Sequence, residues 1–236
     1  MEIKEIVRRA YSKVFQDVLP ILGRLLQQNG MVLMFHSVGG EKDEFNITVD
    51  QFENILKRLK EINVVRLEEW EEQKDFVCLT FDDVPVSFYY NAFPLLQQYN
   101  LPFTIFVSCS LLDTEGYITT GMLKEMSASE LCTVGSHGWK HDFFYKFSLK
   151  GARQDLESSK KHLESLIGMS VELYAFPYGS FYACGHKHKH LVSDYYKYGF
   201  GTVAVPITNP SLLPKYFLPR INVTEVNYKS VITNTK

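Results

Sequence analysis

The sequence lacks the patterns that mark several common classes of protein. It has four cysteines, Cys78, Cys109, Cys132 and Cys184, and no two of them have the CxxC spacing of a zinc cluster. No run reaches the ~18 apolar residues that span a bilayer, and no basic and apolar leader opens the chain. Neither sign of charge dominates, with 25 Lys and Arg against 27 Asp and Glu. These absences argue against a disulfide scaffold, a membrane-spanning protein and a partner made of nucleic acid.

The same observations predict where the protein works. The cysteines are interpreted as reduced, buried thiols, which favours a reducing compartment and a cytoplasmic protein. Residues 1–28 repeat apolar positions three and four apart, which predicts an amphipathic helix that ends at Asn29-Gly30. We interpret this helix as a cover for the core. A homo-oligomer seam and a membrane-peripheral helix are the two alternatives.

From residue 31 onward, short apolar runs alternate with stretches of helical period. Apolar residues make up 45% of the 236 residues and charged residues 22%, as in ordinary globular domains. The alternation predicts an α/β fold with a largely parallel sheet and six to eight units. The predicted strands are Met31–Phe35, Val64–Leu67, Phe76–Phe81, Phe103–Val107, Cys132–Val134, Val171–Phe176, Gly201–Val205 and Tyr216–Val223.

Two adjacent carboxylates, Asp82 and Asp83, follow the predicted strand Phe76–Phe81. Functional side chains gather at the carboxyl ends of parallel strands, so this position is where chemistry is expected. Neighbouring strand residues point to opposite faces, so the two carboxylates share one site only if the strand is already turning into a loop. One could then bind a cation while the other acts as a base. The alternative is that both merely cap a helix or start a turn.

Two histidines, His137 and His141, follow the predicted strand Cys132–Val134. Residues four apart share a helix face, which suits two imidazoles on one metal ion, although two half-exposed surface histidines would give the same pattern. An Asp and two His at separate strand ends supply three ligands and leave positions open for water. Such a set is typical of a catalytic zinc or other divalent site.

A third strand end carries the turn Pro177-Tyr178-Gly179. Pro and Gly force a turn whose backbone N–H groups could face the site and stabilise an oxyanion. A turn with no further role is the alternative.

Taken in this order and spacing, the three segments resemble the polysaccharide deacetylase family, the NodB-like carbohydrate esterase family 4. The resemblance runs from about residue 31 to 223 and includes the opening strand Met31–Phe35, which His36 follows. It implies a deformed (β/α) barrel of about seven strands, with a domain over residues 31–236 and a helical extension over 1–30. It also implies a metal-dependent hydrolase that removes N-acetyl groups from a sugar polymer, an oligosaccharide or a glycolipid.

The resemblance implies a role for each matching residue. Asp82 matches the family's catalytic base, and the metal ligands match Asp83, His137 and His141. Zinc is the expected ion, with cobalt or nickel as alternatives. The expected residues on the substrate and oxyanion side are Pro177, Tyr178 (through its backbone N–H) and Trp139.

The sequence departs from the family pattern in three places. Val84 stands where the family usually has a glycine, and Ala175 stands where it often has an arginine that orients the base. Arg220 could supply that guanidinium from the last predicted strand. No histidine follows His190, so the family's C-terminal general acid is missing, and His36 is the expected substitute.

These departures keep two other functions open. A relative without catalytic activity could use the groove only to bind a glycan. A metal-dependent O-acetyl esterase or small-amide hydrolase is the other alternative, because the leaving group of an ester needs less protonation than an amine.

Overall fold

A computed structural model describes residues 30–40, 44–207 and 213–230. The predicted N-terminal helix and the oligomer seam assigned to it lie outside these residues. Within them, no helix is both long and apolar enough to cross a bilayer.

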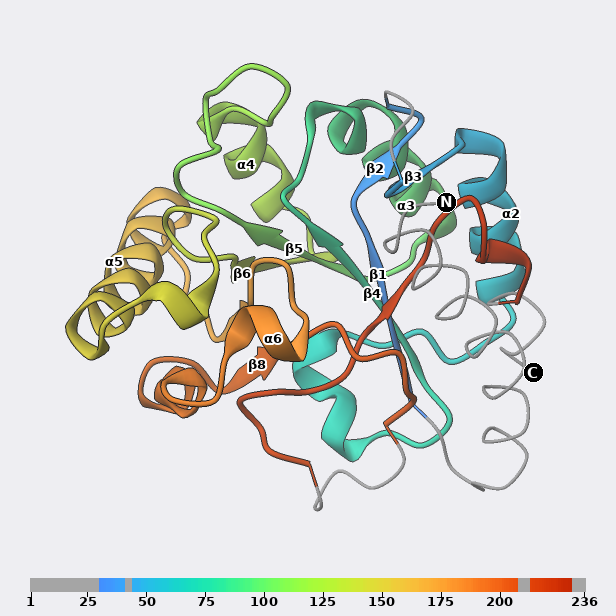
Figure 1. The fold of residues 1–236 in the computed structure, drawn as a ribbon. Helices are drawn as coiled ribbons and strands as arrows, with labels where there is room; N and C mark the ends of the chain where they lie inside the picture. The colour runs from blue at the N-terminus through green and yellow to red at the C-terminus, as the bar shows by residue number, and fades with distance from the viewer. Residues whose placement is uncertain (1–29, 41–43, 208–212, 231–236) are drawn as a thin grey trace, which may run out of the picture.

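Seven parallel strands form one curled sheet in the order β8-β7-β6-β5-β4-β1-β9 (Figure 1). The two edges of this sheet approach each other, because Leu218, just before β9, forms a parallel bridge with Phe200 of β8. The predicted α/β fold and deformed barrel are therefore confirmed. In sheet order the strands are Tyr198–Phe200 (β8), Leu173–Ala175 (β7), Cys132–Ser136 (β6), Phe103–Val107 (β5), Val77–Asp82 (β4), Met31–Phe35 (β1) and Ile221–Asn222 (β9).

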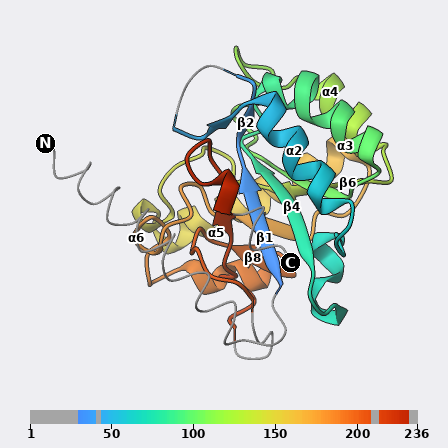
Figure 2. The same cartoon turned by 90° about the vertical axis from the view of Figure 1, so that its right-hand side faces the viewer.

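Helices lie around the outside of the curled sheet, as the two views show (Figures 1 and 2). Local sequence fixes their ends: Thr48 and Gln51 form a capping box at the start of α2, and Gly168 takes a left-handed conformation just after α5. The helices and short turns are α2 (Val49–Leu59), η1 (Leu67–Glu72), η2 (Phe88–Ala92), α3 (Phe93–Tyr99), α4 (Thr120–Ser127), η3 (Phe144–Lys146), α5 (Leu149–Ile167), α6 (Phe181–Cys184) and η4 (Lys189–Asp194). Two short strands, β2 (Ser37–Val38) and β3 (Asn46–Ile47), pair apart from the main sheet.

The strands bury apolar side chains on both faces, as parallel strands do. One face joins the helices in the larger core, to which β4 contributes Leu79 and Phe81. The other face forms a second cluster around the buried Trp70 of η1, and Cys78 of β4 belongs to it. Because side chains alternate along a strand, Asp82 shares its face with Cys78. Asp82 therefore extends from the second face, at the carboxyl end of its strand.

Three of the predicted strands differ from the structure. Val64–Leu67 contributes a single bridge, from Val64 to Val77, before η1 begins. The strand predicted over Gly201–Val205 is wrong, because the chain leaves the sheet there: the N–H of Thr202 donates to Gly179, while β8 is the segment just before. In Tyr216–Val223 only β9 pairs as a strand, since the residues before it span the gap between the sheet edges.

Candidate metal centre

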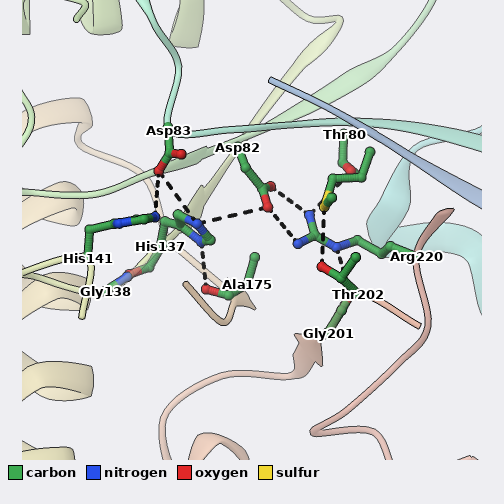
Figure 3. Close-up of polar contacts among 12 residues, drawn as sticks. Thr80, Asp82, Asp83, His137, Gly138, His141, Ala175, Gly201, Thr202 and Arg220 are labelled. Carbon is green, nitrogen blue, oxygen red and sulfur yellow. Dashed lines mark hydrogen bonds and ion pairs between the residues drawn. The ribbon is translucent and has the colours of Figure 1, made fainter. Parts of the chain in front are cut away.

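The carboxyl ends of β4 and β6 bring one carboxylate and two imidazoles together (Figure 3). Asp83 Oδ1 lies 3.0 Å from His141 Nε2 and 3.6 Å from His137 Nε2. One potential ligand atom from each residue lies within 4.8 Å of the others. The two segments that the sequence analysis singled out separately therefore meet at one point.

Unusual backbone conformations hold this arrangement. Of the seven non-glycine residues with positive φ in the described chain, four lie here: Asp83 (61°), Val84 (51°), His141 (47°) and Tyr178 (61°). Such conformations cost roughly 1–3 kcal/mol each and cluster at functional sites. The strand thus turns into a loop at Asp83, as a shared site requires. Val84 adopts the left-handed conformation that a glycine would take at no cost, and its buried side chain packs in the core.

A hydrogen bond fixes the protonation of His137. Its Nδ1 lies 2.8 Å from the backbone oxygen of Ala175, which can only accept, so Nδ1 carries the hydrogen and Nε2 keeps a free lone pair. Burial lowers the pKa of His137 despite the neighbouring carboxylates, so the ring is neutral at pH 7. A neutral imidazole with a fixed tautomer is the form that binds a metal ion.

The set of donor atoms fits a divalent cation. Asp83 Oδ1 is buried and has no well-formed hydrogen bond among the described residues, although it faces both imidazoles. Burial raises the pKa of Asp83, but the adjacent His141 and His137 outweigh burial and hold the pKa well below its usual range. The side chains of Asp83 and His141 stay about one-fifth exposed. A carboxylate and two imidazoles at a partly open site match a catalytic metal centre.

Asp82 lies beside this set but has different partners. Its two oxygens accept hydrogen bonds from Arg220 Nη1 at 2.6 Å and Nη2 at 2.7 Å. Asp82 Oδ2 is also 3.9 Å from His137 Nε2. Arg220 is fully buried, and its Nε donates to the backbone oxygen of Gly201 at 3.1 Å. Burial raises the pKa of Asp82, but the charge and hydrogen bonds of Arg220 together with the nearby His137 outweigh burial and keep the pKa below its ordinary value.

The structure also describes two other predicted site residues, His36 and Pro177. His36 has a buried Nδ1 that lacks a hydrogen-bond partner in the described chain, and its ring lies 4.8 Å from that of Phe45. Burial raises the pKa of Asp82, and His36 is the last of the three neighbours, after Arg220 and His137, that lower it. Pro177 is buried in the turn that leads to Tyr178.

Trp139 is half-buried between the two histidines of the candidate site. Its ring lies 5.1 Å from the ring of His162 on α5, between centroids, and it packs against the larger core. Its backbone N–H donates to both carboxylate oxygens of Asp155 at 3.2 Å. Its contacts thus join the loop between the two histidines to α5.

Sequence reasoning missed Asp155. This buried carboxylate accepts from the loop that carries His137 and His141, and a Cβ at Gly138 would lie 3.0 Å from its Oδ2. Burial raises its pKa, although the backbone N–H groups that it accepts from lower it. The signal was present in the sequence: Leu149, Ala152, Leu156 and Leu163 repeat at helical spacing, and Asp155 lies on the same face, where a charged residue needs a partner.

Comparison with known proteins agrees with this geometry. A family model for polysaccharide deacetylases matches residues 70–192. The chain belongs to the polysaccharide deacetylase family. Like other polysaccharide deacetylases it is a metal-dependent hydrolase, and the alternative of a relative that only binds glycans is not favoured.

Individual polysaccharide deacetylases resemble the chain over most of its length. A poly-β-1,6-N-acetyl-D-glucosamine N-deacetylase of Staphylococcus aureus is 25% identical over 222 residues, which are 85% of this chain and 75% of the relative. The structure of IcaB from Ammonifex degensii is 24% identical with a TM-score of 0.77, covering 88% of this chain and 97% of that one. A Streptococcus pyogenes deacetylase solved with acetate is 20% identical with a TM-score of 0.78, covering 88% and 98%. The two structures support the fold.

Proposed function

We propose that the protein removes N-acetyl groups from a linear polymer of N-acetylated hexosamines, of the poly-β-1,6-N-acetylglucosamine type. One observation carries the proposal: a buried carboxylate held by an arginine, Asp82, lies 3.9 Å from His137 of an Asp-His-His set. This is the pairing of base and metal that the hydrolysis of an amide by water requires. The name of the S. aureus relative supports the choice of polymer.

Asp83, His137 and His141 would hold the ion, and zinc is the proposed metal, with cobalt or nickel as alternatives. When bound, a divalent ion lowers the pKa of water towards ~7 and polarises the acetyl carbonyl. The donor set of one carboxylate and two imidazoles suits zinc, while the same ligands also accept the other two ions.

Asp82 acts as the base in this proposal. It accepts the proton of the attacking water on Oδ2, the oxygen nearer the histidine, as the new bond to the acetyl carbon forms. Arg220 is the positioning residue: its two hydrogen bonds fix the plane of the carboxylate and keep it ionised. It replaces, from the last strand, the arginine that the family often carries where Ala175 stands.

The remaining roles lie on the substrate side. The backbone N–H of Tyr178, positioned by Pro177, would stabilise the oxyanion. Trp139 would shape the substrate side by holding the loop between the two histidines. As the C–N bond breaks, the departing amine takes a proton, and His36 is the proposed acid. An imidazole with an unpartnered buried nitrogen is a suitable donor.

The wider setting is proposed from the sequence. The proposed catalytic domain covers residues 31–236, after a helical extension over 1–30 that covers the core, with a homo-oligomer seam as the alternative. All four cysteines are free and buried, which supports a reducing, cytoplasmic setting. Size-exclusion chromatography of the full chain and cell fractionation test these two points.

Elemental mass spectrometry and acetate release test the function together. The wild type should hold about one divalent ion per chain and release acetate from an N-acetylglucosamine oligomer. His137→Ala should lose both. A wild type that stays metal-free after incubation with zinc, cobalt or nickel would contradict the proposal. Faster release from simple acetate esters than from the oligomer would instead favour the esterase alternative.

A further inference from the structure

A row of aromatic rings leads away from the candidate metal centre. Tyr178 lies 4.9 Å from His141 between ring centroids and stacks on Phe143 at 4.0 Å, with 9° between the planes. Phe143 is 5.7 Å from Tyr145, which is 5.2 Å from Tyr182. We call these four residues, Tyr178, Phe143, Tyr145 and Tyr182, the aromatic strip.

The aromatic strip is exposed to solvent. Tyr178 is 51% exposed, Tyr145 44% and Tyr182 75%. Single apolar side chains on a surface are ordinary, but a continuous exposed patch indicates a site of interaction. The strip is also continuous with the catalytic centre through Tyr178, so a molecule that reacts at the centre can extend across it.

The fold holds the strip in place before any ligand binds. Two segments carry it, the loop around η3 and the turn that leads into α6 together with α6 itself, and α6 contacts η3. Gly185 makes the contact close, because a Cβ at this position would lie 2.8 Å from the Cβ of Tyr145. Rings that are already ordered lose little conformational entropy on binding.

The chemistry of the strip suits an uncharged sugar chain. Ring faces offer apolar area, and tyrosine hydroxyls offer hydrogen bonds at the edges, which matches the apolar faces and polar edges of a pyranose. The nearby Lys146, 4.7 Å from the Phe143 ring, is paired with Asp142 at 3.2 Å. This pair adds no net charge beside Phe143, so a neutral N-acetylated polymer fits better there than an anionic one.

We propose that the aromatic strip binds sugar residues beyond the one that reacts, and so selects a polymer over a single sugar. The proposal rests on the proposed function, because the ligand is the substrate of the same centre. It assigns Tyr145 and Tyr182 as specificity residues that contact the sugar chain without taking part in the hydrolysis.

The test compares a long substrate with a short one. Wild type and Tyr182→Ala are assayed on a β-1,6-linked N-acetylglucosamine hexamer and on 4-nitrophenyl acetate. The ratio of kcat/KM for the hexamer to that for the ester should fall about tenfold, through a higher KM, which corresponds to the loss of one stacking contact. Tyr182→Phe, which keeps the ring, should restore the ratio.

Tyr90→Ala is the matched control. Tyr90 is 63% exposed and contacts a neighbouring ring, that of Tyr89, at 5.3 Å, but it lies outside the strip. Its replacement should leave the ratio at the wild-type value. An equal fall in Tyr90→Ala would overturn the proposal, because it would show a general effect of losing a surface tyrosine.

Calorimetry separates failure of the strip from failure of the proposed function. The hexamer should bind the wild type, with or without metal, about tenfold more tightly than it binds Tyr182→Ala. Equal binding, together with an unchanged ratio in Tyr145→Ala/Tyr182→Ala, would overturn the proposal. Hexamer binding that depends on Tyr182 without any acetate release would support the strip and refute the deacetylase. Sedimentation with phosphatidylglycerol vesicles that depends on Tyr182, without hexamer binding, would overturn the proposal in favour of a membrane surface.

Discussion

Asp82 and Asp83 are neighbours in the chain, but their carboxyl groups lie in opposite surroundings. The side chain of Asp82 is 3% exposed, and both oxygens are bound by Arg220. The side chain of Asp83 is 19% exposed, and its Oδ1 faces two imidazoles without a well-formed hydrogen bond. The positive φ at Asp83 separates the two, since it turns the second carboxyl out of the strand.

The comparison shows how one chemical group can serve two purposes. A carboxylate whose oxygens are held by an arginine cannot reorient towards a cation, but it can accept a proton in a fixed direction. A carboxylate with a buried oxygen that faces two imidazoles, as in Asp83, offers its donor atoms to a cation. The two proposed roles therefore rest on the surroundings of each carboxyl group rather than on residue type.

The largest expected effect comes from replacing the two carboxyls one at a time. Asp82→Asn should lower the rate of acetate release by about 10²–10⁴-fold, because a base is lost, while the metal stays bound. Asp83→Asn should lose both metal and activity. Acetate release and elemental analysis of both variants measure the difference. Equal loss of metal from Asp82→Asn and Asp83→Asn would contradict the assignment of different roles to the two carboxyl groups.

Replacing Arg220 should test the surroundings of Asp82 without changing the side chains of Asp83, His137 and His141. Arg220→Met leaves a buried carboxylate without its partner, which should cost about 3–5 kcal/mol of unfolding free energy, as measured with urea. Arg153→Met is the control, because Arg153 pairs with Asp194 at 3.0 Å on the surface, and its loss should cost at most about 1 kcal/mol. Similar losses in both variants would show that Asp82 does not depend on Arg220.

Asp155→Ala should test whether the loop that carries His137 and His141 needs its hydrogen bonds to α5. The loop between the histidines loses its buried acceptor, so metal affinity should fall by about 10–100-fold, as in other sites with outer hydrogen bonds removed. Titration with zinc and a competing chelator measures this. Glu157→Ala, on the exposed side of α5, should bind zinc like the wild type. Unchanged zinc affinity in Asp155→Ala would show that the loop keeps its conformation without the hydrogen bonds to Asp155.

The smallest expected effect concerns the thiols. Burial raises the pKa of Cys109 and Cys184 to about 12, so both stay protonated from pH 7 to 9. Only the thiolate is nucleophilic, so iodoacetamide should label neither in the folded protein over this range, and urea should expose both. Mass spectrometry of labelled peptides measures the result. Rapid labelling at pH 9 would show that solvent reaches the larger core, in which both thiols are buried.

The sequence predicted the parts of this picture that depend on local pattern. Apolar runs placed β1, β4, β5 and β6 nearly at their observed positions, and the polar residues after two of them meet in space. Parallel strands end at the same edge of a sheet, so motif spacing was enough to predict that a carboxylate of the Asp82-Asp83 pair lies with His137 and His141, and the family resemblance assigned Asp83 to that set.

Features that depend on closure of the barrel were harder to predict. The sequence pointed to Arg220 as a residue that could orient the proposed base. Its two hydrogen bonds to Asp82 form only because the last segment bridges the two edges of the sheet. The strand predicted at Gly201–Val205 was wrong for the same reason, since pairing with that segment decides where β8 ends. The contacts of Asp155 and Trp139 depend on how α5 packs, which no local pattern contains.

The crossing segment also sets an order of events during synthesis. Domains fold as the chain emerges from its N-terminal end. A chain that has emerged as far as Phe200 already contains Asp82, Asp83 and both histidines, but Arg220 is still missing. Until β9 takes its place beside β1, the base has no guanidinium to compensate its burial. The last segment therefore closes the barrel and completes the surroundings of the proposed base together, after all the proposed metal ligands have been synthesised.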